Sequence, residues 1–103
     1  MEKEIMVDLK IGRKDSGLSN KDVAHLLDAD NSRISRLERG HARPTAKELC
    51  GLCLVYGRSA EHLFRLTTRS LIAPLKKRLS TMPPEPANWS RQHDKRLDTL
   101  NGL

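Results

Sequence analysis

The segment from Leu18 to Pro44 most constrains the fold, because its pattern predicts two short helices with almost no chain between them. Ser19 and Asp22 have the spacing of a capping box, which starts a helix. The apolar stripe of this first helix is Val23, Ala24 and Leu27. A second helix must begin within a few residues.

That second helix has its own start and stop signals. Asp30 is placed to cap a helix over residues 31 to about 39, and Gly40 is placed to end it. Asp28 and Ala29 leave no room for a longer loop between the two helices. Two helices joined this closely form a helix-turn-helix, whose second helix can enter the major groove of DNA.

The two sides of the second helix differ in chemistry. Ile34 and Leu37 lie on one side at helical spacing. The other side carries only hydrogen-bonding or cationic groups, namely Asn31, Ser32, Arg33, Ser35, Arg36 and Arg39. We interpret this polar side as the one that faces DNA, against the alternative that it is an ordinary solvated cationic face.

Glu38 is the exception, because it lies on the apolar side with Ile34. An unpaired carboxylate there would carry a heavy desolvation cost. Arg13 follows Ile5 and Leu9 at four-residue spacing on the preceding helix, so it faces the same core. We therefore predict a structural ion pair between Arg13 and Glu38.

Residues from about Glu4 to Phe64 resemble the phage-repressor and Cro-type family of helix-turn-helix proteins, also called the xenobiotic-response-element family. The matching positions are the run from Arg13 to Gly17, Leu18 and Ser19, the Ala24 position, the IxRLERG run from Ile34 to Gly40, and the ARP run from Ala42 to Pro44. The resemblance implies an all-α, five-helix repressor-like domain that binds DNA.

The resemblance also implies the roles of individual residues. Base contacts are implied for Asn31, Ser32, Arg33 and Arg36. Arg can bind guanine bidentately and Asn can pair with adenine, which suits Arg36 and Asn31 to reading sequence. Phosphate contacts are implied for Ser19, Asn20, Lys21, Arg39, His41 and Arg43.

Three positions depart from the family pattern. Asn20 stands where the family usually has Gln, which is one methylene longer. Asp28 stands where the family favours Gly, and Asp tolerates the left-handed conformation better than most residues. Asp30 replaces the usual Ser or Thr cap and brings a carboxylate close to the DNA backbone, so we expect lower non-specific affinity.

Charge agrees with a polyanionic partner, since the chain of 103 residues has a net charge of +6. Residues 1–66 hold 12 basic and 10 acidic side chains, whereas residues 67–103 hold 7 and 3. Binding by the first segment would therefore depend on a few placed arginines. Tyr56, Phe64 and Trp89 are the only aromatic residues, so single-strand binding by base stacking is not expected.

Two further helices complete the predicted domain. Thr45 and Glu48 form a second capping box, and Gly57 is placed to end that helix. Its inward residues are Leu49, Leu52, Cys53 and Tyr56. Ser59 caps the last helix, which brings Leu63 and Phe64 to the core.

The sequence motifs give little support to a redox protein, a metalloprotein, an enzyme or a membrane protein. Cys50 and Cys53 form a CxxC motif, but a thioredoxin-like βαβ pattern and a set of four zinc ligands are missing, so we interpret both as buried core residues. No nucleophile, base and orienting group recur at a spacing that suggests an enzyme, and neither a metal nor a cofactor is expected. The charged N-terminus and the lack of a long apolar run predict a cytoplasmic protein outside the membrane.

Residues 67–103 are predicted to be a separate helical extension. Pro74 interrupts the apolar stripe of Leu71, Ile72, Leu75 and Leu79, and is predicted to lie in the first turn of a helix that runs to about Thr81. Residues 82–86 form a proline-rich spacer. Beyond it, the predicted face of a last helix is Trp89, His93, Leu97 and Leu100.

We interpret Trp89, Leu97 and Leu100 as a dimer or partner contact, because one thin apolar stripe cannot stabilise an isolated helix. The alternative is that this helix folds back on residues 1–66. The whole sequence then predicts a transcriptional regulator of phage, plasmid or chromosomal type, most simply a homodimeric repressor on a palindromic operator. Two alternatives stay open: an antitoxin whose tail binds its toxin, and a protein-interaction module without DNA binding.

Overall fold

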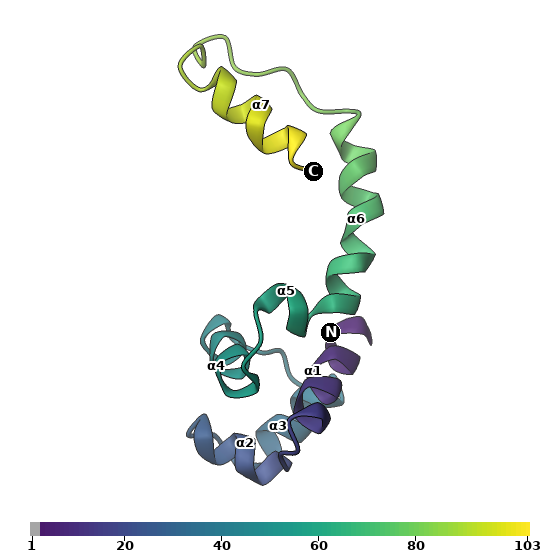
Figure 1. The fold of residues 1–103 in the computed structure, drawn as a ribbon, viewed down its shortest axis with the longest axis vertical. Helices are drawn as coiled ribbons and strands as arrows, with labels where there is room; N and C mark the ends of the chain where they lie inside the picture. Colours follow the sequence, from purple (N-terminus) through teal and green to yellow (C-terminus); the bar gives the residue numbers. More distant parts are fainter. Residues whose placement is uncertain (1–2) are drawn as a thin grey trace. The chain divides into compact units, whose positions relative to one another are not determined.

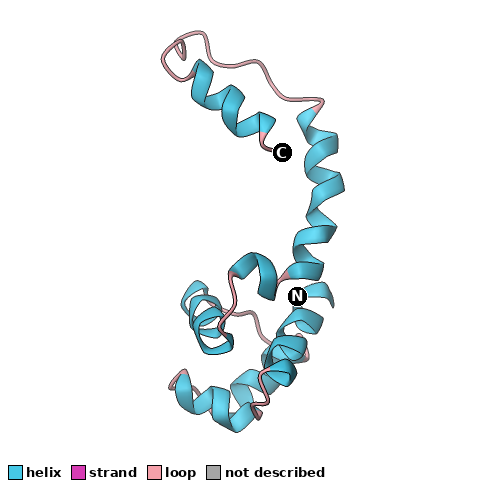
Figure 2. Ribbon diagram, in the orientation of Figure 1, coloured by secondary structure: helices cyan, strands magenta, loops and turns pink. Residues whose placement is uncertain are grey.

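The computed structural model describes residues 3–103, and this part of the chain contains seven α-helices and no strand (Figure 1 and Figure 2). The helices are α1 (Lys3–Asp15), α2 (Asn20–Leu26), α3 (Asn31–Glu38), α4 (Ala46–Tyr56), α5 (Ala60–Leu63), α6 (Arg65–Leu79) and α7 (His93–Asn101). The chain divides into two compact units, residues 1–68 and 69–103. The boundary falls two residues after the predicted one.

Helices α1 to α5 surround one small apolar core. It is built from Leu9, Val23, Ala24, Ile34, Leu37, Leu52, Tyr56 and Leu63, with Leu27, Cys53 and Phe64 among the partly buried residues around it. Helices α2 and α3 lie against each other, and α1 packs against α3. The predicted all-helical domain is therefore confirmed, with the two motif helices as neighbours.

The helix starts and ends of this unit follow local chemistry. Ser19 and Thr45 cap α2 and α4 through complete capping boxes, and Ser59 caps α5 by accepting a hydrogen bond from an amide of the first turn. Gly57 ends α4 in the left-handed conformation. Asp28 has a φ of 52°, the left-handed turn that we expected it to tolerate.

The prediction that Asp30 caps α3 is only half right. Asp30 has the extended backbone of an N-cap residue, but its side chain accepts no backbone N–H. Its Oδ2 atom accepts a hydrogen bond from the Ser32 hydroxyl at 3.3 Å instead. The short carboxylate is therefore engaged two residues further along α3, and the first amides of that helix lack a side-chain cap from Asp30.

The interpretation of the cysteines as two buried residues is wrong for Cys50. Cys50 is exposed and Cys53 is partly buried. The reason is helical geometry, because α4 turns its Leu52 and Tyr56 side chains into the core. Cys50 lies two residues before Leu52, about 200° around the helix, and so faces away from that core.

Asp8 is a buried carboxylate that no motif in the sequence indicates. It is 4% exposed, and its Oδ2 atom accepts hydrogen bonds from the Thr67 amide and hydroxyl, both at 3.0 Å. Its Oδ1 atom accepts one from the Leu66 amide at 3.3 Å. A residue of α1 therefore supplies the acceptor for amides in the first turn of α6, a role usually filled by the helix's own N-cap.

The predicted position of Pro74 is wrong. Helix α6 begins at Arg65, so Pro74 lies in its interior and not in its first turn. The helix starts earlier than expected because Asp8 stabilises its first turn. Pro74 has no amide hydrogen, so α6 loses one helical hydrogen bond there and depends on its other residues to stay continuous.

Trp89 also departs from the prediction, since it lies in the turns before α7 and not on the helix. Its amide donates to the Pro86 carbonyl at 3.0 Å, and its own carbonyl accepts from the Gln92 amide at 2.9 Å. The turns therefore include Trp89, which we had predicted on the face of the helix.

The proline-rich spacer, residues 82–86, contains neither helix nor strand. Two side chains of α7 contact it: Arg96 donates to the Pro83 carbonyl at 2.8 Å, and His93 pairs with Glu85 at 2.9 Å.

Candidate nucleic-acid interface

The polar face of α3 is exposed at most of its positions, and Arg33 and Ser35 are partly buried. Ile34 and Leu37 are almost completely buried, whereas Asn31, Ser32 and Arg36 are exposed on the other side. Arg39 is the exposed C-cap residue of the same helix. The structure therefore brings three of the four predicted base-contacting residues together on one open surface.

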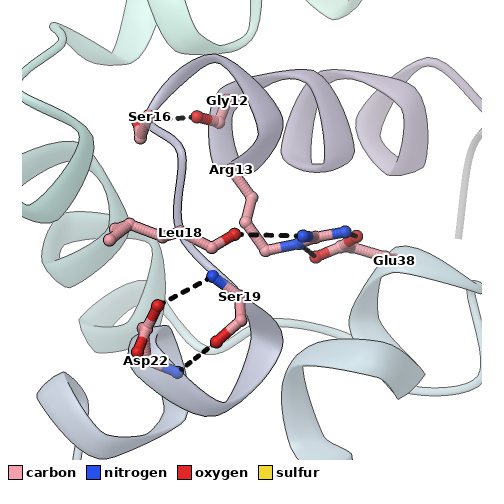
Figure 3. A network of polar contacts seen from close by, with 7 residues as sticks. All are labelled: Gly12, Arg13, Ser16, Leu18, Ser19, Asp22 and Glu38. Carbon is pink, nitrogen blue, oxygen red and sulfur yellow. Dashed lines mark hydrogen bonds and ion pairs between the residues drawn. The ribbon is translucent and has the colours of Figure 1, made fainter.

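The end of α3 is tied to α1 by the pair formed by Arg13 and Glu38 (Figure 3). The Arg13 guanidinium donates to both carboxylate oxygens of Glu38, at 2.8 and 3.0 Å, and to the Leu18 carbonyl at 3.1 Å. The Glu38 side chain is only 7% exposed. One cation thus joins α1, the α1–α2 connection and the end of α3.

The contact between Arg13 and Glu38 is partly buried, and it shifts the pKa values of two groups. Its hydrogen bonds to Glu38 raise the pKa of Arg13 above its usual value. Burial raises the pKa of the neighbouring Tyr56 to about 12, and the Glu38 carboxylate adds to that shift. Tyr56 therefore stays neutral beside the ion pair at any physiological pH.

Arg33 is the fourth predicted base-contacting residue, and its guanidinium is already bound to another side chain of the protein. Its guanidinium donates to both carboxylate oxygens of Glu48, at 2.8 and 2.7 Å, and to the Arg43 carbonyl at 2.9 Å. Fifteen residues separate Arg33 from Glu48, so no helical spacing could have predicted this pair. The capping-box position of Glu48 was the one available signal, because it fixes the carboxylate at the start of α4.

The predicted phosphate-contacting residues fall into two groups, one before α3 in the chain and one after it. Lys21 and Ser19 are exposed at the start of α2, and the second group is exposed at the end of α3 and in the loop that follows: Arg39, His41 and Arg43. Asn20 is partly buried, and its Oδ1 atom is buried without a hydrogen-bond partner. A phosphate contact by Asn20 would therefore come from its amide nitrogen.

Within residues 3–103, no group of three or more His, Cys, Asp or Glu side chains is arranged to hold a metal ion. None of the helices that the structure describes is long and apolar enough to span a membrane. The exposed side chains of α3 are Asn31, Ser32 and Arg36, whose hydrogen-bonding and cationic groups can contact phosphates and base edges, and Asp30 adds an exposed carboxylate at the start of the helix.

Comparison with known families decides what this motif is. A helix-turn-helix family model matches residues 9–63, which is more than half of the chain and includes α2, α3 and α4. The chain belongs to the Cro/C1-type helix-turn-helix family. The comparisons with curated proteins and with solved structures gave no match. This helix-turn-helix protein thus has the fold of a DNA-binding regulator, as its sequence predicted.

Proposed function

We propose that this helix-turn-helix protein is a sequence-specific transcriptional regulator, most simply a repressor that binds a palindromic operator as a homodimer. The observation that carries the proposal is the set of exposed polar side chains on α3, a helix tied to α1 through Glu38 and Arg13, together with the exposed cations of α2 and of the segment after α3. Occupation of a promoter by such a protein would block polymerase sterically. An exposed helix face of this kind reads the major groove, and the flanking cations set its register on the phosphates.

Arg36 is the residue on which we expect most direct readout to depend. Arg36→Ala should weaken operator binding by about 1–3 kcal/mol and relax base preference at one position in each half-site. Arg43→Ala should weaken all sequences to a similar extent, because a phosphate contact carries no sequence information. Titration of the two variants against an operator selected from random DNA, and against its single-mismatch versions, separates these effects. Unchanged affinity in Arg36→Ala would contradict the assignment of α3 as the recognition helix.

We further propose that residues 69–103 join two copies of the chain. No residue of α6 or α7 is buried. The large apolar side chains exposed in this unit are Leu71, Ile72, Leu75, Met82, Trp89, Leu97 and Leu103, with Leu100 partly buried. A unit without a core of its own needs a partner surface, and a dimeric regulator can bind two half-sites about 34–36 Å apart, the spacing of successive major grooves.

Removal of the apolar side chains of the extension should abolish the dimer. We expect Trp89→Ser combined with Leu97→Ser, and truncation after Met82, to give a monomer by sedimentation analysis and to weaken operator binding. Thr99→Ser is the matched control, because it removes only one methyl group from α7, the helix that carries Leu97. Variants that stay dimeric and bind operator as tightly as the native chain would exclude the dimer contact and favour a separate protein partner, as in an antitoxin.

A further inference from the structure

Arg33 lies among the predicted base readers, but its guanidinium faces a carboxylate of the same chain. The Nε and Nη2 atoms of Arg33 donate to the two oxygens of Glu48 at 2.8 and 2.7 Å, in the bidentate geometry of a strong charge-assisted contact. The two side chains are 24% and 18% exposed. Solvent therefore screens this pair only in part.

Glu48 also makes two hydrogen bonds with Thr45, one through its carboxylate and one through its amide. Its Oε1 atom accepts a hydrogen bond from the Thr45 amide at 2.8 Å, while its own amide donates to the Thr45 hydroxyl at 3.1 Å. The hydrogen bonds from Arg33, followed by those from Thr45, lower the pKa of Glu48 to about 2. The carboxylate is therefore ionised at every pH at which DNA binding would be measured.

The contacts of Arg33 reach the loop between α3 and α4. Its Nη2 atom donates to the carbonyl of Arg43 at 2.9 Å, while the Arg43 side chain is exposed. At the other end of the loop, Gly40 turns the chain with a φ of +75°. The backbone of the segment that carries Arg39, His41 and Arg43 is thus fixed at its start by a turn and at its end by Arg33.

We propose that Arg33 and Glu48 act together as positioning residues, which hold the cationic loop 39–45 in register with α3. On this proposal, which rests on the proposed DNA-binding function, Asn31, Ser32 and Arg36 read the operator and Arg33 does not contact a base. To reach a base, Arg33 would have to leave Glu48 unpaired and partly buried close to the DNA phosphates, which is costly. Lys cannot replace Arg33, because an ammonium group cannot make the bidentate contact.

Glu48→Gln gives the sharpest test, because simple electrostatics predicts the opposite sign. Removal of a negative charge near DNA should strengthen binding in general. We instead expect Glu48→Gln and Arg33→Lys each to weaken binding by about tenfold or more, the lower end of the loss typical of a hydrogen bond to a charged group. The loss should be equal for the operator and for every single-mismatch operator. The double variant should bind the operator at least as tightly as the single variant with the lower affinity.

The measurement is fluorescence anisotropy on full-length protein, with an operator selected from random DNA by the native chain and with the folded fraction of each variant checked by circular dichroism. Glu61→Gln is the matched control, since it removes an exposed carboxylate from α5 and should not weaken binding. A second readout is the Nε–H resonance of Arg33, which we expect to keep its position when operator is added while that of Arg36 shifts.

Three results would overturn the proposal. Relaxed preference at one base in Arg33→Lys, with undiminished affinity in Glu48→Gln, would make Arg33 a base reader. Lower melting temperatures with unchanged affinity of the folded protein would leave the pair a purely structural contact. A native chain that selects no sequence from random DNA would overturn the proposed function itself, and the positioning role with it.

Discussion

Replacement of Arg13 by alanine is expected to lower the free energy of unfolding by about 3–5 kcal/mol, the range seen when one partner of a buried pair is removed. Glu38, whose side chain is only 7% exposed beside Arg13, would lose both of its charge-assisted hydrogen bonds. The Leu18 carbonyl would also lose a donor. Because the described part of the first unit has a core of eight buried apolar residues, a loss of this size would remove much of its stability.

Thermal and urea unfolding of Arg13→Ala, Glu38→Ala and the double variant would measure the coupling of the two residues. We expect the double variant to lose clearly less than the sum of the single variants, since removal of both charges leaves neither one unpaired. Arg58→Ala is the matched control: its ion pair with Asp15, at 3.2 Å, has a carboxylate that is 54% exposed, so its loss should cost less than about 1 kcal/mol. Additive effects of Arg13→Ala and Glu38→Ala would mean that the contact contributes nothing.

The first unit was predictable because its signals are local. Ser19 with Asp22 and Thr45 with Glu48 mark helix starts within four residues, and Gly57 marks an end in the same way. The pairing of Arg13 with Glu38 could also be predicted from the sequence, although 25 residues separate them. Each lies on the apolar stripe of its own helix, and two opposite charges facing one small core have few other partners.

Contacts that no periodicity encodes could not be predicted. Arg33 was placed correctly on the polar side of α3, but its pairing with Glu48 depends on where α4 begins in space. We assigned Pro74 to the start of a helix, whereas α6 begins at Arg65. The sequence offers no sign of this start, because the residue that stabilises it, Asp8, is nearly sixty residues away in the chain. Trp89 was assigned to a helix because its spacing from His93 fits a helical face, although the turns before α7 reach as far as Gln92.

Asp8 provides the second large expected effect. Asp8→Ala removes the carboxylate that accepts three hydrogen bonds from Leu66 and Thr67, and hydrogen bonds to charged groups are worth about 1.5–3 kcal/mol each. We expect the free energy of unfolding to fall by about 2–4 kcal/mol, because relaxation and water recover part of that sum. The helix dipole adds to the effect, since a negative charge at the start of α6 is favourable.

Chemical unfolding followed by circular dichroism would measure this loss, and the choice of replacement separates its causes. Asp8→Asn keeps one oxygen acceptor and the shape of the side chain, so it should lose less than Asp8→Ala. Asp15→Ala, the same change on the same helix, is the control; its carboxylate is 54% exposed and pairs only with Arg58 among the described contacts, so less than about 1 kcal/mol should be lost. Hydrogen exchange should locate the effect, with the amides of Leu66 and Thr67 losing protection before those of α2 and α3. Equal losses in Asp8→Ala and Asp15→Ala would show that burial of the Asp8 carboxylate contributes nothing to the start of α6.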